Sequence, residues 1–339
     1  MTHRFPLKEI ARQAGLGTAT VDRAINNRAH VSPQTQARVT AAIAELKAQE
    51  TQLSARGRRM FFDFVTEAPS RFSREIQTAA EKILPQIGPA VCRPRFLSQE
   101  IMSETEVLSA LNRIAKRGSH GICLKARNLP AIRDAVDNLI ASGIPVVTLV
   151  TDILPSQRTA YVGLDNHSAG RTAAFLIAQT VGQTTGTILA TRSNARFQGE
   201  EARETAFRET LGTLCPNLHI IDINGGNGIH YETAKLMHKV VDQLTNLRGV
   251  YSMGGGNKTI LDVLDQHHLK PNIFVAHDLD QENRALIQRG HLHYVLHHNL
   301  ETDLHNVFGS FLHHHKLTSD PPVNTISNIQ VITPMNVPI

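Results

Sequence analysis

Hydrophobic positions in the first fifty residues recur at helical spacing. Leu7, Ile10, Ala11 and Ala14 stand at i, i+3, i+4 and i+7, so one apolar stripe runs along a helix that begins near Pro6. Two further stripes of this kind follow, and the residues they are expected to bury are Val21, Ala24, Ile25, Val39, Ala42, Ile43 and Leu46. Three short amphipathic helices that pack these stripes together predict a small head domain.

The boundaries of these helices are marked by residues with known conformational preferences. Gly15 can adopt the left-handed conformation that ends a helix, and a second helix is expected to start near Gly17 or Thr18. Ser32 and Pro33 favour the first positions of a third helix. The order predicts a helix-turn-helix, whose second helix enters the major groove of DNA. A dinucleotide-binding loop is disfavoured because no strand precedes these glycines and no third glycine follows at the required spacing.

From Phe61 onward, apolar runs of strand length alternate with helical stretches. Helices are expected over 72–87, 104–116 and 130–141, and the expected strands are FFDFV, AVCRP, HGICLK, PVVTLV, TAYVGL, GTILAT, LHIIDI, GVYSM, NIFVAH and HYVLHH. This alternation is typical of parallel sheets flanked by helices, and its repetition predicts two doubly wound parallel-sheet lobes after the all-α head, an α/β chain. Ligands of such sheets bind at the carboxyl ends of the strands, here between the lobes.

Charge is distributed unevenly along the 339 residues. Residues 1–59 carry ten Lys/Arg and four Asp/Glu, a net charge of +6, whereas the remainder carries 25 and 26, a net charge of −1. A basic head on a nearly neutral body is typical of a protein that binds a polyanion such as DNA. Short polar side chains at Thr18 and Thr20, with Arg23, suit contacts with base edges.

Several other functions lack support in the sequence. Cys92, Cys123 and Cys215 are far apart and form no C-x-x-C pair, so we expect buried, inert thiols. Consecutive histidines in a helix point about 100° apart and cannot share one ion, so we expect neither a metal nor a cofactor. Motifs of hydrolases, metalloproteases and P-loop proteins are missing from the sequence, and we do not expect an enzyme. No apolar run reaches the roughly 20 residues of a membrane span, and no signal peptide is apparent, so we expect a cytoplasmic protein.

Residues 6–46, PLKEIARQAGLGTATVDRAINNRAHVSPQTQARVTAAIAEL, resemble without gaps the DNA-binding head of the lactose-repressor (LacI/GalR) family of bacterial transcription regulators. The resemblance implies a double-stranded DNA operator that is bound by paired heads of a homodimer. Asp22 departs from the serine usual there, and its carboxylate would repel phosphates unless a neighbour pairs with it. The implied DNA contacts are Thr18, Ala19, Thr20, Arg23, Asn26, Asn27 and Arg28.

The linker departs from the family pattern more strongly. In the family, a hinge helix opened by Pro-Asn inserts a leucine into the minor groove. Here Glu50 and Thr51 stand in place of Pro-Asn, and Gly57 or Arg58 stands at the leucine position. The remaining hinge candidates are Leu53, as an alternative wedge, and Arg56, Arg58 and Arg59, as electrostatic phosphate contacts.

The body resembles the type I periplasmic sugar-binding fold that the family joins to its head. The similar segments are YVGLDNHSAGRTAAFLI, ARETAF, VAHDLD and VLHHNL. Carboxylates and guanidinium groups can each engage two neighbouring sugar hydroxyls, and aromatic rings cover the apolar sugar face, although phenylalanine also commonly fills cores. The implied effector-binding residues are Asp152, Arg203, Asp278, Asn257 and His298, which replaces the usual glutamine, with Phe72 and Phe197 as the aromatic candidates.

These observations predict a sequence-specific DNA-binding transcriptional repressor, controlled by a sugar or sugar derivative bound between two lobes. The alternative is a solute-binding protein of a sugar transport system, which would need no basic head. Expected boundaries are a DNA-binding domain over 1–47, a linker over 48–59 and an effector-binding and dimerisation domain over 60–339. Within that domain the expected lobes are 60–162 with 293–322, and 163–292 with 323–339.

Overall fold

The head is a three-helix unit, as the sequence predicts. The computed structural model describes residues 5–28, 31–55, 58–322 and 324–338, and the head comprises α1 (Leu7–Ala14), α2 (Thr18–Ile25) and α3 (Pro33–Ala55). Gly15 ends α1 with a φ of 62°, and Ser32 Oγ accepts a hydrogen bond of 3.1 Å from the N–H of Thr35. Leu7 is exposed despite its place on the predicted stripe. The buried core residues are Phe5, Ile10, Ala11, Ala14, Val21, Ala24, Val39, Ala42 and Leu46.

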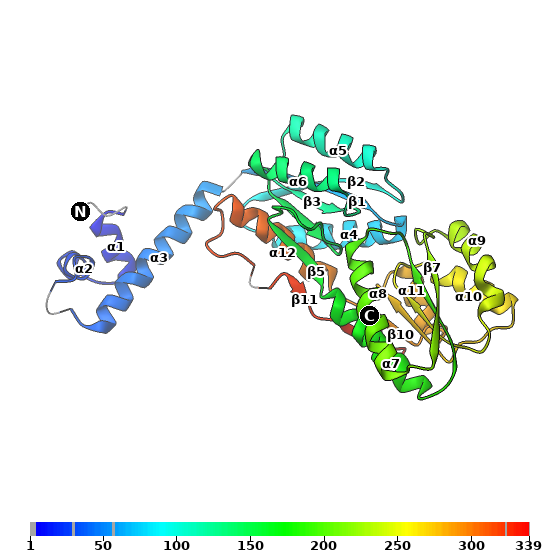
Figure 1. Ribbon diagram of the computed structural model, residues 1–339. Coiled ribbons are helices and arrows are strands. Elements are labelled where there is room, and N and C mark those ends of the chain that lie inside the picture. Colours follow the sequence, from blue (N-terminus) through cyan, green and yellow to red (C-terminus); the bar gives the residue numbers. More distant parts are fainter. Residues whose placement is uncertain (1–4, 29–30, 56–57, 323, 339) are drawn as a thin grey trace.

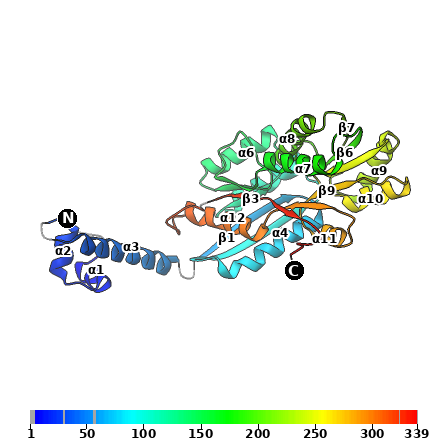
Figure 2. The same cartoon turned by 90° about the horizontal axis from the view of Figure 1, so that it is seen from below.

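The third helix is longer than expected. Helix α3 continues to Ala55 and therefore runs through most of the predicted linker over 48–59. Its residues after Leu46, KAQETQLSA, are mostly good helix formers, and the first glycine after them is Gly57, so nothing in this stretch ends the helix earlier. Figure 1 shows α3 extending from the body with α1 and α2 at its far end, and Figure 2 shows the same extended arrangement from below.

The first lobe is built on a six-stranded sheet in the order β11-β5-β4-β3-β1-β2, in which all described pairings are parallel. Helices α4 and α12 cover one face, where Phe62, Phe64, Phe308 and Phe311 pack together, and α5 and α6 cover the other. The elements are β1 (Arg59–Glu67), α4 (Ser70–Ile83), η1 (Leu84–Gln86), β2 (Val91–Gln99), α5 (Glu104–Arg117), β3 (Ile122–Lys125), α6 (Pro130–Ala141), β4 (Val146–Leu149), β5 (Ala160–Leu164), α12 (Leu300–His314) and β11 (Ile326–Ser327).

The second lobe repeats this plan with the order β12-β10-β9-β8-β6-β7, in which β12 alone is antiparallel to its neighbour among the described pairings. Helices α7 and α8 pack on one face of the sheet, and α9, α10 and α11 pack on the other. The elements are α7 (Asn166–Val181), β6 (Gly186–Arg192), α8 (Gln198–Leu214), β7 (Leu218–Asn224), α9 (His230–Val240), η2 (Val241–Gln243), β8 (Leu247–Ser252), α10 (Asn257–Gln266), β9 (Ile273–His277), α11 (Gln281–Gln288), β10 (Tyr294–His297) and β12 (Gln330–Ile332).

The chain crosses between the lobes three times: between β5 and α7, between β10 and α12, and between β11 and β12. The second and third crossings differ from the expected boundaries at 293 and 323. Strand β10 pairs with β9 in the second sheet, Tyr294 opposite Val275, and β11 pairs with β5 in the first. A strand's sheet is decided by its hydrogen-bond partner, which its own hydrophobic pattern does not encode.

The cysteines behave as the sequence suggests. Cys92, Cys123 and Cys215 are free thiols and are buried. Burial raises the pKa of the Cys92 thiol to about 12, because a thiolate is poorly solvated there. In the described part of the chain, no helix is long and apolar enough to cross a membrane.

Candidate functional site

Helix α2 presents a polar surface to solvent. Its inner side buries Val21 and Ala24, whereas Thr18, Ala19 and Arg23 are exposed and Thr20 is half-buried. No side chain caps the N-terminus of α2, and the N–H of Thr20 donates to the carbonyl of Gly17 at 3.0 Å, which leaves the N–H groups of Thr18 and Ala19 without a partner in the described part of the chain. Thr18, Ala19 and Thr20 therefore lie together in the first turn of α2, and Arg23 lies in its last turn.

The residues that follow α2 also pair with Asp22. Asn26 donates from Nδ2 to Asp22 Oδ1 at 2.9 Å, and Arg28 NH1 lies 3.2 Å from Asp22 Oδ2. This pairing with Arg28 offsets the negative charge that would otherwise repel phosphates. Asn27 is exposed, with a φ of 49° in the turn after the helix. The predicted backbone contacts thus lie together beside α2.

Two of the predicted hinge side chains, Arg58 and Arg59, lie within the described residues, and both are exposed. Arg58 is exposed immediately before β1. Arg56 and the side chain of Leu53 lie outside the described residues.

A cleft lies between the two lobes, at the carboxyl ends of the strands. Four of the predicted effector residues line it: Phe72, Phe197, Arg203 and Asp278. The lining residues that the sequence analysis did not single out include Glu67, Arg71, Lys125, Ser193, Glu200, Asn227, Asp280 and Asn283. Glu67 and Lys125 are the last residues of β1 and β3, and Ser193 follows β6, so the rule that ligands bind at strand ends could have found these three.

Arg203 is held rigidly although it is buried. It lies on α8 with 3% of its surface exposed, and it donates from Nε to Asn166 Oδ1 (2.6 Å) and from NH1 to the carbonyl of Met253 (3.2 Å). Helices α7 and α8 meet closely at Gly170, where an added Cβ would lie 2.2 Å from the carbonyl oxygen of Arg203. No carboxylate within the described ranges forms an ion pair with Arg203, so its remaining N–H groups are available to a ligand in the cleft.

Asp278 follows β9 with a φ of 62°. The backbone carbonyl of Asp278 accepts a hydrogen bond of 2.7 Å from Asn283 Nδ2, which fixes the turn. The buried Oδ1 of Asp278 has no hydrogen-bond partner in the described part of the chain, and it lies 3.5 Å from His298 Nε2. Burial alone would raise the pKa of Asp278, but the nearby charges of His298 and Arg203 hold it well below its usual range. The group is therefore an ionised acceptor with free capacity.

Lys125 lies between the two aromatic candidates. Its Nζ is 4.4 Å from the centroid of the Phe197 ring and 5.9 Å from that of Phe72, and it donates to the carbonyl of Glu67 at 3.0 Å. Burial lowers the pKa of Lys125, although Glu200 and Glu67 counteract this effect. An ammonium group that makes one such contact has further N–H donors for a ligand.

Arg71 spans the cleft from the first lobe to the second. Its Nε lies 2.8 Å from Asp280 Oδ2, and its NH1 donates to the carbonyl of Gly228 at 3.0 Å. Arg71 belongs to α4, whereas both partners belong to the second lobe. These contacts can form only while the lobes are close together.

Two predicted residues lie behind the lining rather than on it. Asn257, 1% exposed at the start of α10, donates to Asn283 Oδ1 at 2.7 Å. His298 is 0% exposed and lies between Asp278 and Asp303. Asn257 contacts Asn283 and His298 contacts Asp278, and these two partners line the cleft. Asn257 and His298 therefore act on the cleft only through them.

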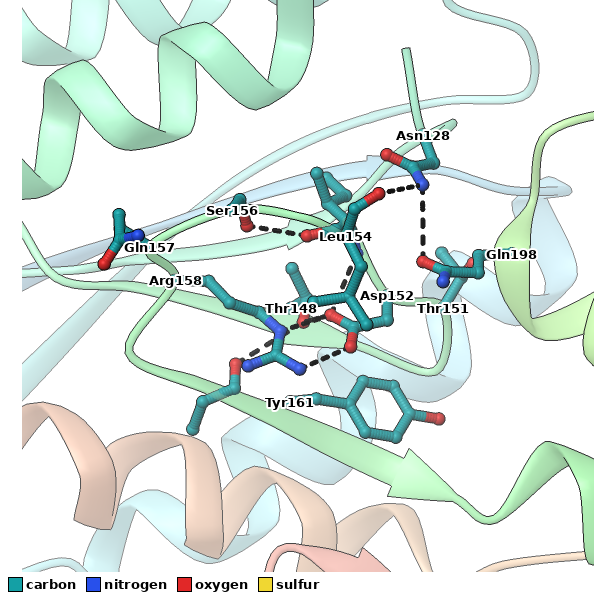
Figure 3. Close-up of polar contacts among 12 residues, drawn as sticks. Asn128, Thr148, Thr151, Asp152, Leu154, Ser156, Gln157, Arg158, Tyr161 and Gln198 are labelled. Atoms are coloured by element: carbon teal, nitrogen blue, oxygen red, sulfur yellow. Dashed lines mark hydrogen bonds and ion pairs between the residues drawn. The ribbon is translucent and has the colours of Figure 1, made fainter. Parts of the chain in front are cut away.

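Asp152 lies outside the cleft lining, in the loop between β4 and β5. Its Oδ1 accepts hydrogen bonds from Thr148 Oγ1 (2.7 Å) and from the N–H of Ile153 (2.8 Å), and its carboxylate pairs with Arg158 (Figure 3). These contacts already use both oxygens of the Asp152 carboxylate, which does not line the cleft. The same loop touches the second lobe through Asn128, whose Nδ2 donates to the carbonyl of Leu154 and to Gln198 Oε1.

The described residues contain no group of three or more His, Cys, Asp or Glu that could hold a metal ion.

Comparison with known proteins agrees with this architecture. Residues 6–47 match the model of the bacterial regulatory proteins, lacI family, and residues 67–299 match that of the periplasmic binding protein domain. A sucrose operon repressor from Pediococcus pentosaceus is 27% identical over 228 residues, which are 63% of this chain and 63% of the repressor. The match thus spans less than two thirds of that relative.

Solved structures agree on the fold of the body. The glucose-galactose binding protein GanP from Geobacillus stearothermophilus is 18% identical, with a TM-score of 0.71 over 83% of this chain and 99% of its own. A solute-binding protein from Burkholderia graminis, in complex with D-arabinose, is 14% identical, with a TM-score of 0.72 over 82% and 96%. The predicted fold class is confirmed. The chain belongs to the periplasmic binding protein domain family over residues 67–299, and its residues 6–47 form a head of the bacterial regulatory proteins, lacI family.

Proposed function

We propose that this protein is a sequence-specific DNA-binding transcriptional repressor, controlled by a sugar-like effector that binds in the interlobe cleft. The observation that carries the proposal is the combination, on one chain, of a helix-turn-helix with an exposed polar α2 and a two-lobed body with a polar cleft. The sucrose operon repressor supports the same combination of DNA and sugar. A regulator of this kind acts in the cytoplasm, where the chromosome is, and catalyses no reaction.

In the proposed complex, the N-terminal end of α2 enters the major groove. Thr18, Ala19 and Thr20 face base edges, and the guanidinium of Arg23 reaches a base or a phosphate. The Asn26, Asn27 and Arg28 segment holds the DNA backbone beside them. One head of this size makes few contacts, so specific binding requires a homodimer that places two heads on a roughly palindromic operator.

In the cleft, the effector hydroxyls are shared between one cation and one anion. Arg203 donates to neighbouring hydroxyl oxygens, Asp278 Oδ1 accepts from hydroxyl protons, and Phe72 and Phe197 flank the apolar face of the ring. Lys125 adds a further donor beside Phe197. The cleft thus offers hydrogen-bond donors, Arg203 and Lys125, and an acceptor, Asp278, and a polyol hydroxyl can pair with either kind of group.

Effector binding acts on DNA binding through a population shift between lobe arrangements. Contacts such as Arg71–Asp280 and the hydrogen bond from the N–H of Gly199 to Thr151 Oγ1 join the lobes only when they are close. Helix α3 ends three residues before Arg58, and β1 begins at the next residue, so the head is attached directly to the first lobe. A changed lobe angle in a dimer alters the spacing of the two heads and hence their fit to successive grooves.

A gel-shift experiment on the upstream region of the protein's own operon tests the proposal. Wild-type protein is expected to shift the fragment, and sucrose, D-glucose, D-galactose or D-arabinose is expected to change the midpoint. Arg23→Ala should weaken binding by roughly tenfold or more, since one such contact contributes about 1–3 kcal/mol. Arg113→Ala, which removes an exposed charge on α5, is the matched control.

The same experiment distinguishes a repressor from the alternative, a solute-binding protein. Sugar binding without any DNA shift would favour a solute-binding protein of a transport system, which the sugar-binding structural neighbours suggest. Equal DNA binding by wild type and Arg23→Ala would contradict the assignment of α2 as the reading helix.

A further inference from the structure

One buried imidazole lies between a buried carboxylate, Asp303, and a half-buried one, Asp278, at the point where the chain leaves the second lobe. His298 and Asp303 are each 0% exposed, and His298 Nδ1 lies 2.5 Å from Asp303 Oδ2. On its other side, His298 Nε2 lies 3.5 Å from the cleft-lining Asp278 Oδ1. Asp303 also accepts a hydrogen bond from Ser327 Oγ. The four side chains form one continuous polar chain, which we name the crossing relay.

The members of the crossing relay come from both lobes. Asp278 follows β9 of the second lobe, and His298 comes directly after β10, where the chain leaves that lobe. Asp303 lies in the first turn of α12 in the first lobe, and Ser327 is the last residue of β11, just before the chain returns to the second lobe. The relay therefore connects the effector cleft to two of the three crossings about which the lobes turn.

Electrostatics favours an imidazole that carries a proton on each nitrogen. A buried carboxylate without a cation is strongly destabilised, and Asp303 has no other cationic partner in the described part of the chain. A neutral imidazole would also present a lone pair to one of the two carboxylates. An imidazolium instead points an N–H at each carboxylate, so it holds Asp303 in place and attracts Asp278 Oδ1 across 3.5 Å. Neither Asp278 Oδ1 nor His298 Nε2 has a hydrogen-bond partner in that part.

We propose that His298 is a positioning residue: as an imidazolium it holds Asp278 ready for the effector and transmits the effector's contact with Asp278 to the two crossings. This inference rests on the proposed effector cleft and deepens it by naming how the cleft is coupled to lobe movement. When a hydroxyl of the effector donates to Asp278, the carboxylate shares its charge with a new donor, and the imidazolium is drawn more fully to Asp303 on α12.

The titratable groups around His298 support this assignment. Burial would lower the pKa of His298, but Asp278 and Asp303 raise it to about 9. His277, on β9, has a pKa held well below its usual range by burial and by Arg203, and burial lowers the pKa of His297 to about 4. These two neighbours therefore stay neutral at pH 7. Because the raised pKa lies above the ordinary value, the charge on His298 is present at pH 7 and is lost as the pH rises through about 9.

An NMR titration of the histidine side chains in the ligand-free full-length protein tests the relay without any effector. The signal that is missing from His298→Gln identifies His298. We expect this imidazole to remain charged up to about pH 9, and Asp278→Asn should lower its midpoint by about one unit or more, as an opposite charge at this distance requires. A midpoint near 6.5, or one that Asp278→Asn leaves unchanged, would overturn the proposal.

A second arm measures coupling to the cleft by calorimetry with sucrose, D-glucose, D-galactose and D-arabinose. For a sugar that binds wild type, affinity should fall between pH 8 and pH 10, and His298→Gln should bind about tenfold more weakly with no such pH dependence. His297→Gln, which replaces the adjacent imidazole, should keep the wild-type profile. If none of these sugars binds, the proposed effector class is wrong, while the NMR titration still decides the relay.

Discussion

Replacement of Arg71 by alanine should shift the lobes toward an open arrangement. Its guanidinium joins α4 to Asp280 and to the carbonyl of Gly228 in the second lobe, and both contacts are lost when the lobes separate. In the Arg71→Ala protein the closed arrangement loses this ion pair, whereas the open arrangement loses nothing comparable. The closed-to-open ratio must therefore decrease.

The burial of the pair sets the size of the effect. The side chains of Arg71 and Asp280 are 19% and 6% exposed, so solvent screens their interaction only partly. A hydrogen bond to a charged group contributes about 1.5–3 kcal/mol. However, burial raises the pKa of Asp280 even though Arg71 and the N–H of Asn283 act to lower it. Much of the attraction is thus offset by desolvation. We place the net contribution at the low end, about 1.5 kcal/mol, which corresponds to a roughly tenfold change in the closed-to-open ratio.

Spin labels on exposed positions of the two lobes measure this ratio directly. Cysteines introduced at Asn112 on α5 and Lys239 on α9 can be labelled selectively, because the native cysteines are buried. Arg71→Ala should broaden the ligand-free distance distribution and weaken effector binding by about tenfold, since binding selects the closed form. Arg74→Ala, an exposed arginine on the same helix, is the control. Identical distance distributions in the two variants would refute the role of Arg71 in closure.

Three other substitutions test separate parts of the structure. Arg203→Ala should weaken effector binding by about a hundredfold in calorimetry, because it removes a fixed bidentate donor, while operator binding in a gel shift stays intact; unchanged sugar affinity would remove Arg203 from the site. Gly170→Ala should lower the stability of the body by about 1–3 kcal/mol in denaturant unfolding, since the added Cβ meets the carbonyl of Arg203 at 2.2 Å. Ile10→Ala should destabilise the head by about 2–4 kcal/mol and reduce operator binding, whereas the body transition in calorimetric melting should not move.

The sequence analysis singled out four residues that line the cleft, and one of them, Asp278, stands at a strand end that is visible in the sequence. The hydrophobic run that becomes β9 stops at His277, so Asp278 could be placed at the edge of its sheet, and Arg203 follows from its resemblance to the family segment. Lys125 carried the same signal, as the last residue of β3, but a lone lysine at a strand end has no distinctive chemistry. Asp152 carried a misleading signal: it follows a strand, yet it is engaged by Arg158 and Thr148.

The sequence alone determined the helix and strand periods, the basic head and the repeated α/β plan, because each depends on residues a few positions apart. Tertiary structure decided which sheet β10 joins, how α4 reaches the second lobe through Arg71, and which partners surround His298. Arg71 and Asp280 are about two hundred residues apart in the chain. Only the packing of the two lobes brings such groups within hydrogen-bonding distance, because a local pattern contains no information about a distant partner.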